Sequence, residues 1–156
     1  MDVFELRRYQ DADATRVWHL HQDGLRQVDA WVDDGPGDED LRSVRATYLT
    51  SGGEFLVGLL DGELVAMGGL RRVSHTVGQI KRMGVDIRFQ RQGFGRTVLR
   101  ALELRARELG YRRLHLDTTT RQAPAQSLYQ SCGYQEVGRG TYPSGLQMIV
   151  FEKEIV

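Results

Sequence analysis

Residues 80–109 constrain the fold more than any other part of the chain, because a strand, a glycine-bearing loop and a helix follow one another there. The loop contains Gly93 and Gly95, and Gly110 stands where the helix should stop. The first amides of a helix have no partner inside it, and the aligned peptide dipoles make that end partly positive. Since glycine also allows a ligand to approach the backbone closely, the segment predicts an anion site, for which phosphate is the natural guest.

Arg91 and Arg96 add formal charge to this loop, although the same glycines could simply make a tight turn between a strand and a helix. A Rossmann dinucleotide loop has a third glycine three residues after Gly95, where Val98 stands. A Walker loop carries Gly-Lys-Ser/Thr, and no such run occurs. The pattern therefore favours a phosphate-bearing ligand outside the two common nucleotide motifs.

Length and composition predict one globular domain over residues 1–156. Lys plus Arg equals Asp plus Glu at 21 each, so there is no global basic field for nucleic acid. The single cysteine, Cys132, rules out an internal disulfide and suits a reducing compartment. The amino terminus lacks the apolar core of a signal peptide, and no apolar run approaches the roughly 18 residues that a membrane span requires. We therefore expect a cytoplasmic protein that binds neither nucleic acid nor membrane.

The first elements along the chain are an expected edge strand and a helix. Val3–Arg8 alternates as a short edge strand should. A helix capped by Asp11 or Asp13 should reach about Gln27, with Trp18 in the core rather than in a site.

A turn-rich acidic loop follows, and its last residues should begin a second helix that reaches about Thr50. A solvated loop is the simplest account of its acids, and the alternative is a surface that attracts a cationic substrate. The acids are Asp33, Asp34, Asp38, Glu39 and Asp40.

The middle of the chain predicts an antiparallel meander of three strands. Two apolar runs, at 54–60 and 63–70, flank the dipeptide Asp61-Gly62, which is the strongest short hairpin signal. A strand at 78–86 should then pair with this hairpin, after a polar connection at 71–77.

The last third predicts a parallel strand, a short helix and a closing hairpin. The amphipathic helix after Gly95 leads to a strand at 114–117, and a strand–helix–strand crossover implies a parallel pair. Residues 123–132 form a short helix, and 134–137 pairs with 147–154. The whole predicts an α+β fold, with a mixed sheet of six or seven strands flanked by about four helices.

The pattern Gln90-x-x-Gly93-x-Gly95 after a strand resembles the acyl-coenzyme A signature of the GNAT N-acetyltransferase family. The order of elements also resembles the GNAT fold over essentially the full chain. Residues 80–86 stand where the family's fourth strand precedes the loop, and 125–134 is similar to its Ala-x-x-Leu-Tyr-x-x-x-Gly-Phe segment.

The resemblance implies acetyl-coenzyme A as the co-substrate and no metal. Loop amides would bind its diphosphate, with Arg91 near the phosphates, and its pantetheine arm would run along the splayed end of the fourth strand. An extended amide-bearing chain can act as an added strand on an open edge, and the Val85 amide would polarise the thioester carbonyl. The residues assigned to this ligand are Met83, Gly84, Val85, Gln90, Arg91, Gln92, Gly93, Phe94, Gly95, Arg96 and Gln122.

Tyr129 matches the tyrosine that gives its proton to the departing coenzyme A sulfur in many members of the family. A pKa of about 10 keeps that proton available at neutral pH, and general acid help is typically worth roughly 10²–10⁴-fold. The alternative is a packed tyrosine whose hydroxyl is tethered to the backbone. Cys132 ends a helix, whereas reactive cysteines favour helix starts, so we interpret it as packing and expect direct transfer in a ternary complex.

Two residues depart from the family pattern. Gln79 stands where many relatives carry a glutamate base, and glutamine cannot usefully accept a proton. Water chains ending at His115, Asp117 or His75 remain open, as does an amine that arrives neutral, although the apolar neighbours of His115 favour a structural role. Gln122 stands where asparagine is common, which should weaken one contact to the ligand.

The acceptor should lie between the first two helices and the hairpin loop at 138–145, where Tyr142 could line a pocket. A small amine, an amino acid, an aminoglycoside and a protein amino terminus all remain open. A homodimer is allowed, because dimers are frequent in the family. The alternative from another class is a non-catalytic acyl-coenzyme A-binding sensor module, which the glutamine at Gln79 would favour.

Overall fold

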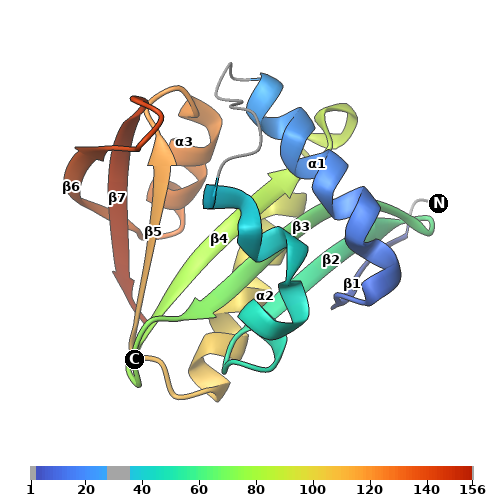
Figure 1. Cartoon of the computed structure of the whole chain (residues 1–156), viewed down its shortest axis with the longest axis horizontal. Coiled ribbons are helices and arrows are strands. Elements are labelled where there is room, and N and C mark those ends of the chain that lie inside the picture. The colour runs from blue at the N-terminus through green and yellow to red at the C-terminus, as the bar shows by residue number, and fades with distance from the viewer. Residues whose placement is uncertain (1–2, 28–35, 156) are drawn as a thin grey trace.

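The computed structural model describes residues 3–27 and 36–155 and contains a seven-stranded mixed sheet with helices on both faces (Figure 1). The strand order is β1-β2-β3-β4-β5-β7-β6. The strands are β1 (Phe4–Arg8), β2 (Glu54–Leu60), β3 (Glu63–Arg72), β4 (Val77–Val85), β5 (Arg113–Thr119), β6 (Gln135–Thr141) and β7 (Gln147–Glu154). The helices are α1 (Ala14–Gln27), α2 (Phe94–Glu108) and α3 (Ala123–Ser131), with short helical segments η1 (Asp11–Asp13), η2 (Pro36–Arg42), η3 (Arg45–Leu49) and η4 (Ile87–Phe89).

The predicted antiparallel meander is confirmed by the pairing of β2 with β3 and of β3 with β4, and β1 adds a further antiparallel strand beside β2. Its central hairpin turns at Asp61 and Gly62, whose φ angles of 51° and 86° are both positive. Two successive positive φ angles match the right-handed twist of the flanking strands, which is why an Asp-Gly pair predicts this turn.

Two hydrophobic clusters lie against the sheet and fix its helices. One contains Leu99 and Leu102 from α2 together with Leu114 and Leu116 from β5. The other contains Val17 and Leu20 from α1, Tyr48 from η3, and Phe55 and Val57 from β2. Apolar stripes on α1 and α2 are thus buried against the sheet.

The sheet opens between β4 and β5, the only parallel pair in the described chain. Pairing joins Val77–Gln79 to Arg113–His115 and continues no further. Beyond that point the two strands diverge, as Figure 1 shows. The rest of β4 therefore has a free edge on the side of β5.

Three expectations are wrong in detail. The helix expected to reach Thr50 is two short segments, η2 and η3, and Asp40 of η2 accepts bonds from both Arg82 on β4 and Tyr48 of η3. The first helix, α1, begins only at Ala14, after η1, whose capping box joins Gln10 and Asp13: the N–H of Gln10 donates to the Asp13 carboxylate at 2.8 Å.

The closing hairpin is also longer than expected, because β6 continues to Thr141 through a register shift between Glu136 and Gly138. Its turn is confined to residues 142–146. Trp18, which we expected in the core, is half-buried against one hydrophobic cluster and carries the guanidinium of Arg42 over its ring at 5.3 Å.

Candidate functional site

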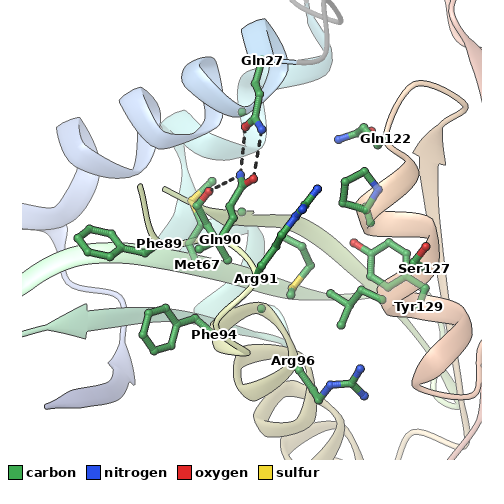
Figure 2. A pocket seen from close by; sticks show the side chains of 18 of the residues that line it. Gln27, Met67, Phe89, Gln90, Arg91, Phe94, Arg96, Gln122, Ser127 and Tyr129 are labelled. Carbon is green, nitrogen blue, oxygen red and sulfur yellow. Dashed lines mark hydrogen bonds between the residues drawn. The ribbon is translucent and has the colours of Figure 1, made fainter. Parts of the chain in front are cut away.

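A pocket of about 710 Å³ lies where the end of β4, the start of α2, α1 and α3 meet (Figure 2). Its size is typical of a small-molecule or cofactor site. Gln92 is exposed and is not among the lining residues. The predicted residues that line it are Met83, Gly84, Val85, Gln90, Arg91, Gly93, Phe94, Gly95, Arg96, Gln122 and Tyr129.

The loop before α2 turns through two residues in the left-handed region, Arg91 at φ 63° and Gly93 at φ 88°. Gly93 is the N-cap of α2, and the N–H of Thr97 donates to its carbonyl at 3.0 Å. The amides of residues 94–96 come before this bond and have no acceptor within the helix. They form the positive end of the helix dipole at the wall of the pocket.

The two glycines have different reasons to be there. A Cβ at Gly93 would meet nothing within 4 Å, so its glycine serves the positive φ angle. A Cβ at Gly95 would lie 3.5 Å from both Leu128 and Val85, two residues that line the pocket. The protein alone would tolerate that carbon, and its absence keeps the helix start open to a ligand.

The side chain of Gln90 is engaged by the protein. Its amide nitrogen donates to the carbonyl of Val85 at 3.0 Å and to Gln27 of α1 at 3.0 Å, and its oxygen accepts from Gln27 at 3.1 Å (Figure 2). Gln90 therefore ties α1 and the end of β4 to the loop.

The free edge of β4 presents backbone groups toward the pocket. The N–H of Asp86 donates to the carbonyl of Val65 at 2.7 Å, so Ala66 and Val85 form a pair without mutual hydrogen bonds. The N–H and carbonyl of Val85 must then point away from β3. The Val85 carbonyl already accepts a hydrogen bond from Gln90. The Val85 N–H is therefore the group at this edge that can donate to a ligand.

Tyr129 projects from α3 into the pocket (Figure 2) and is 6% exposed. Its ring packs on Tyr134 and Phe151 at centroid distances of 6.0 and 6.2 Å. Burial raises the pKa of Tyr129, and the charges of Asp117 and Cys132 raise it further. Among the described residues no hydrogen bond holds the hydroxyl, so the tether that was the alternative to an acid role is not seen there.

The side chains of Gln122 and Arg96 each make hydrogen bonds within the protein. The Gln122 oxygen accepts from the Thr118 hydroxyl at 2.8 Å and the Thr119 N–H at 3.0 Å, while its amide nitrogen faces the pocket (Figure 2). Arg96 donates to the Ser131 hydroxyl at 2.7 Å and to the Cys132 sulfur at 3.3 Å, which joins α2 to α3.

The acceptor side of the sheet carries a different set of contacts. Asp40 accepts two bonds from Arg82, at 2.7 and 2.9 Å, and one from the Tyr48 hydroxyl at 2.5 Å. The side chains of Asp40 and Arg82 are 7% and 15% exposed, so Asp40 is a structural anion here, not an open attractant. Of the other acids expected in this loop, Asp33 and Asp34 lie outside the described residues.

Asp117 and Tyr142 also meet on this side, with the Tyr142 hydroxyl donating to the carboxylate at 2.5 Å. Gln79 lies next to them and approaches the second oxygen of Asp117 at 3.5 Å. His75 is exposed before the start of β4, at the opposite end of that strand from the pocket, and contacts Arg72. His75 is therefore out of reach as a base.

Sequence reasoning missed the contribution of α1 to the pocket. Leu20, His21 and Gln27 line it, and the side chain of His21 is buried. The only signal was a polar side chain on an apolar face, which is not specific. Within residues 3–27 and 36–155, no group of three or more side chains could hold a metal, and no helix is long and apolar enough to cross a membrane.

Residues 13–134 match the family model described as "Acetyltransferase (GNAT) family". Human N-acetyltransferase 8 is 31% identical over 109 residues, which is 66% of this chain and 48% of that protein. The chain thus spans about half the length of the mammalian relatives it matches. An aminoglycoside N(6')-acetyltransferase type 1 of Stenotrophomonas maltophilia is 29% identical over 88% of this chain and 90% of its own.

Solved structures share the fold at low sequence identity. A GNAT-family acetyltransferase of Staphylococcus aureus Mu50 matches with a TM-score of 0.89 at 20% identity, covering 99% of this chain and 100% of that one. A GNAT-family acetyltransferase of Elizabethkingia anophelis, solved with acetyl-CoA bound, matches with a TM-score of 0.74 at 21% identity, covering 97% of each chain. The α+β fold expected from the sequence is confirmed.

Proposed function

The chain belongs to the GNAT family of acetyltransferases, and on this basis we propose that it transfers an acetyl group from acetyl-coenzyme A to a primary amine. The observation that carries the proposal is a single pocket that joins the unpaired amides at the start of α2 to the hydroxyl of Tyr129. We place this activity in one domain spanning residues 1–156, because both hydrophobic clusters lie against one sheet.

The residues of the loop fit an acyl-coenzyme A. Amides of residues 92–96 would bind the diphosphate, with the charge of Arg91 beside it. The open edge of β4 would pair with the pantetheine arm, using the N–H of Val85, and the amide nitrogen of Gln122 faces the same space. When bound, acetyl-coenzyme A supplies the activated acetyl group as a thioester. That Elizabethkingia protein, which shares the fold, was solved with this ligand.

Tyr129 supplies the proton that the leaving thiolate needs. Its raised pKa keeps the phenol protonated at neutral pH, and its place in the pocket wall puts that proton near the end of β4. After Tyr129 has given its proton to sulfur, its phenolate recovers one from the nitrogen that has been acylated. The transfer then takes place directly in a ternary complex, without a covalent enzyme intermediate.

The acceptor is a primary amine, and several classes deserve testing. The Stenotrophomonas maltophilia relative is an aminoglycoside acetyltransferase that aligns over most of both chains, so an aminoglycoside belongs in the test. The other members of the panel are an aliphatic monoamine, an amino acid and a peptide with a free amino terminus.

Release of free thiol from acetyl-coenzyme A, measured over this panel, tests the proposal. We expect saturable thiol release with at least one amine and mass-spectrometric detection of its acetylated product. Tight binding of coenzyme A with no thiol release across the panel would instead support the acyl-coenzyme A sensor, which the glutamine at Gln79 favours.

A further inference from the structure

We propose that Asp117 accepts the proton of the incoming amine, from a position on β5 next to the glutamine that replaces the family's glutamate. The inference rests on the acetyltransferase function proposed above and adds a residue to it. Three features support it: the divergence of β4 and β5 at Asp117, the hydrogen bond from Tyr142 to its carboxylate, and the charged groups around that carboxylate.

Asp117 stands at the mouth of the opening between the two strands. The last paired residues are Gln79 on β4 and His115 on β5. Asp117 is two residues further along β5, on the same face as His115, where the strands have begun to diverge. Its Oδ2 atom is 3.5 Å from the amide nitrogen of Gln79. The side chain of Gln79 cannot accept a proton, but the carboxylate of Asp117 lies next to it and can.

The carboxylate is held by one oxygen and leaves the other for a ligand. The Tyr142 hydroxyl donates to Oδ1 at 2.5 Å. Burial raises the pKa of Tyr142, and its bond to Asp117 raises it further, so Tyr142 stays a donor at neutral pH. The contact of Oδ2 with Gln79 is at the outer limit of a hydrogen bond, so an ammonium group can replace it at little cost.

Asp117 also lies within electrostatic reach of Tyr129. Burial raises the pKa of Tyr129 most, and the charge of Asp117 raises it further. Tyr129 also contributes to the raised pKa of Tyr142. The proton donor of the proposed reaction and the proposed proton acceptor therefore lie close enough for their charges to interact.

The charge of Asp117 is available, because no salt bridge within 4.0 Å joins it to a cation in the part of the chain that the structure describes. Lys81 is half-buried on β4 and its pKa is lowered, chiefly by burial and then by Arg82, with Asp117 acting weakly in the opposite sense. The titratable groups on neighbouring elements that interact with Asp117 are Lys81, Tyr129 and Tyr142.

The proton steps balance. Asp117 takes one proton from the ammonium group, and the freed lone pair forms a C–N bond with the acyl carbon as the C–S bond breaks. Tyr129 protonates the sulfur and recovers a proton from the nitrogen. Asp117 then releases its proton to solvent, so one ammonium ion and one thioester give one amide, one thiol and one proton.

The test compares two acceptors of matched shape, an alkylamine that is protonated at pH 7 and an alkoxyamine that is neutral there. The alkylamine is the aliphatic monoamine of the panel. In Asp117→Asn we expect kcat/KM to fall roughly 100-fold with the alkylamine, the size of a lost general base, and to change little with the alkoxyamine, which needs no base. Glu136→Gln, which removes an exposed carboxylate paired with Arg139 on β6, should change neither.

A binding measurement provides a readout that does not depend on turnover. Calorimetry of the alkylamine into protein saturated with coenzyme A should show weaker amine binding in Asp117→Asn and unchanged coenzyme A affinity. Tyr142→Phe should reproduce the selective loss with the alkylamine in smaller degree, because the carboxylate remains but is no longer held.

Three results overturn the inference. An equal loss with both acceptors would make Asp117 structural, and unchanged turnover of Asp117→Asn would remove it from the reaction. Either result, with wild-type thiol release intact, leaves the acetyltransferase proposal standing. Absence of thiol release by the wild-type protein with every amine would overturn both.

Discussion

The donor side, which is the pocket, and the proposed acceptor side next to it are built from different kinds of groups. Asp40, Arg82, Asp117 and Tyr142 of the acceptor side are not among the residues that line the pocket. The donor side consists of backbone groups: the amides that begin α2 and the free edge of β4. The acceptor side consists of side chains that hold one another from distant segments, such as Asp40 with Arg82 and Asp117 with Tyr142. The groups on the donor side depend on the conformation of the backbone, and those on the acceptor side depend on which residues are present.

Because of this difference, the two sides tolerate different kinds of substitution. Backbone amides are present whatever the side chains are, so the donor side can fail only through bulk, charge or lost glycine conformations. Side-chain pairs can be exchanged one residue at a time, so the acceptor side can change its ligand without changing the fold. We therefore expect substitutions that add bulk or negative charge to the donor side to abolish ligand binding, and acceptor-side substitutions to change rate or stability.

Gly95→Glu is the most damaging change we expect on the donor side. A Cβ at Gly95 fits the protein alone, so the fold should survive, but the carboxylate would occupy the space where phosphate should bind. We expect calorimetry to detect no coenzyme A binding. Gly138→Glu is the matched control, because a Cβ there meets nothing within 4 Å and β6 is remote from the pocket. Normal coenzyme A affinity in Gly95→Glu would refute the assignment of the loop.

Tyr129→Phe tests the point where the two sides meet. The ring packing on Tyr134 and Phe151 is retained, and only the proton donor is lost. We expect kcat to fall about 100-fold, and at least tenfold, with nearly unchanged coenzyme A affinity. The measurement pairs steady-state thiol release with calorimetry. If kcat is unchanged, Tyr129 has no acid role and the pocket needs another proton donor.

The same contrast explains what could be predicted from the sequence. The donor side lies in one contiguous stretch, so Gly93 and Gly95 could be predicted from the local pattern, and Val85 was assigned from the resemblance to the GNAT family. The acceptor side depends on pairs that are far apart in the chain: Asp40 and Arg82 are 42 residues apart, and Tyr142 and Asp117 are 25 apart. Local periodicity carries no information on such pairs.

The misplaced second helix has the same origin. The sequence predicted one continuous segment to about Thr50, whereas the structure has two, with Asp40 of the first bonded to Arg82 of β4 and to Tyr48 of the second. Tertiary contacts override local preference where the preference is weak. The contact between Gln27 and Gln90 was missed for the same reason, because 63 residues separate them.

Asp40→Asn should destabilise the acceptor side of the protein without changing coenzyme A binding on the donor side. It leaves the largely buried Arg82 with a neutral partner, and we expect the free energy of unfolding to fall by about 2 kcal/mol, as for a lost hydrogen bond to a charged group. Urea denaturation at pH 7 measures this. Coenzyme A affinity of the folded variant should equal that of wild type. A large loss of that affinity would show that the two sides are not separable.

The pH dependence of the same variant gives a signed test. Burial acts to raise the pKa of Asp40, but the bonds and charge of Arg82, with the Tyr48 hydroxyl, outweigh it and hold the pKa below its ordinary value. A lowered pKa in the folded state stabilises the protein above the unfolded value of about 3.9, and this stabilisation is lost as the pH falls through the folded value. The difference between wild type and Asp40→Asn should therefore shrink below about pH 4.

Arg91→Ala should have the smallest effect, and it sharpens the claim that backbone rather than side chains builds the donor side. Arg91 is exposed and holds a φ of 63°, which alanine would hold equally, so the substitution removes charge without changing the loop. Exposed charges contribute on the order of 0.2–1 kcal/mol, so the Kd for coenzyme A should rise only about threefold, and less at high salt. Arg112→Ala, before the start of β5 at the far end of the sheet, is the control. A rise in Kd of about 100-fold or more would mean that the Arg91 guanidinium, and not the row of amides at the start of α2, provides most of the diphosphate affinity.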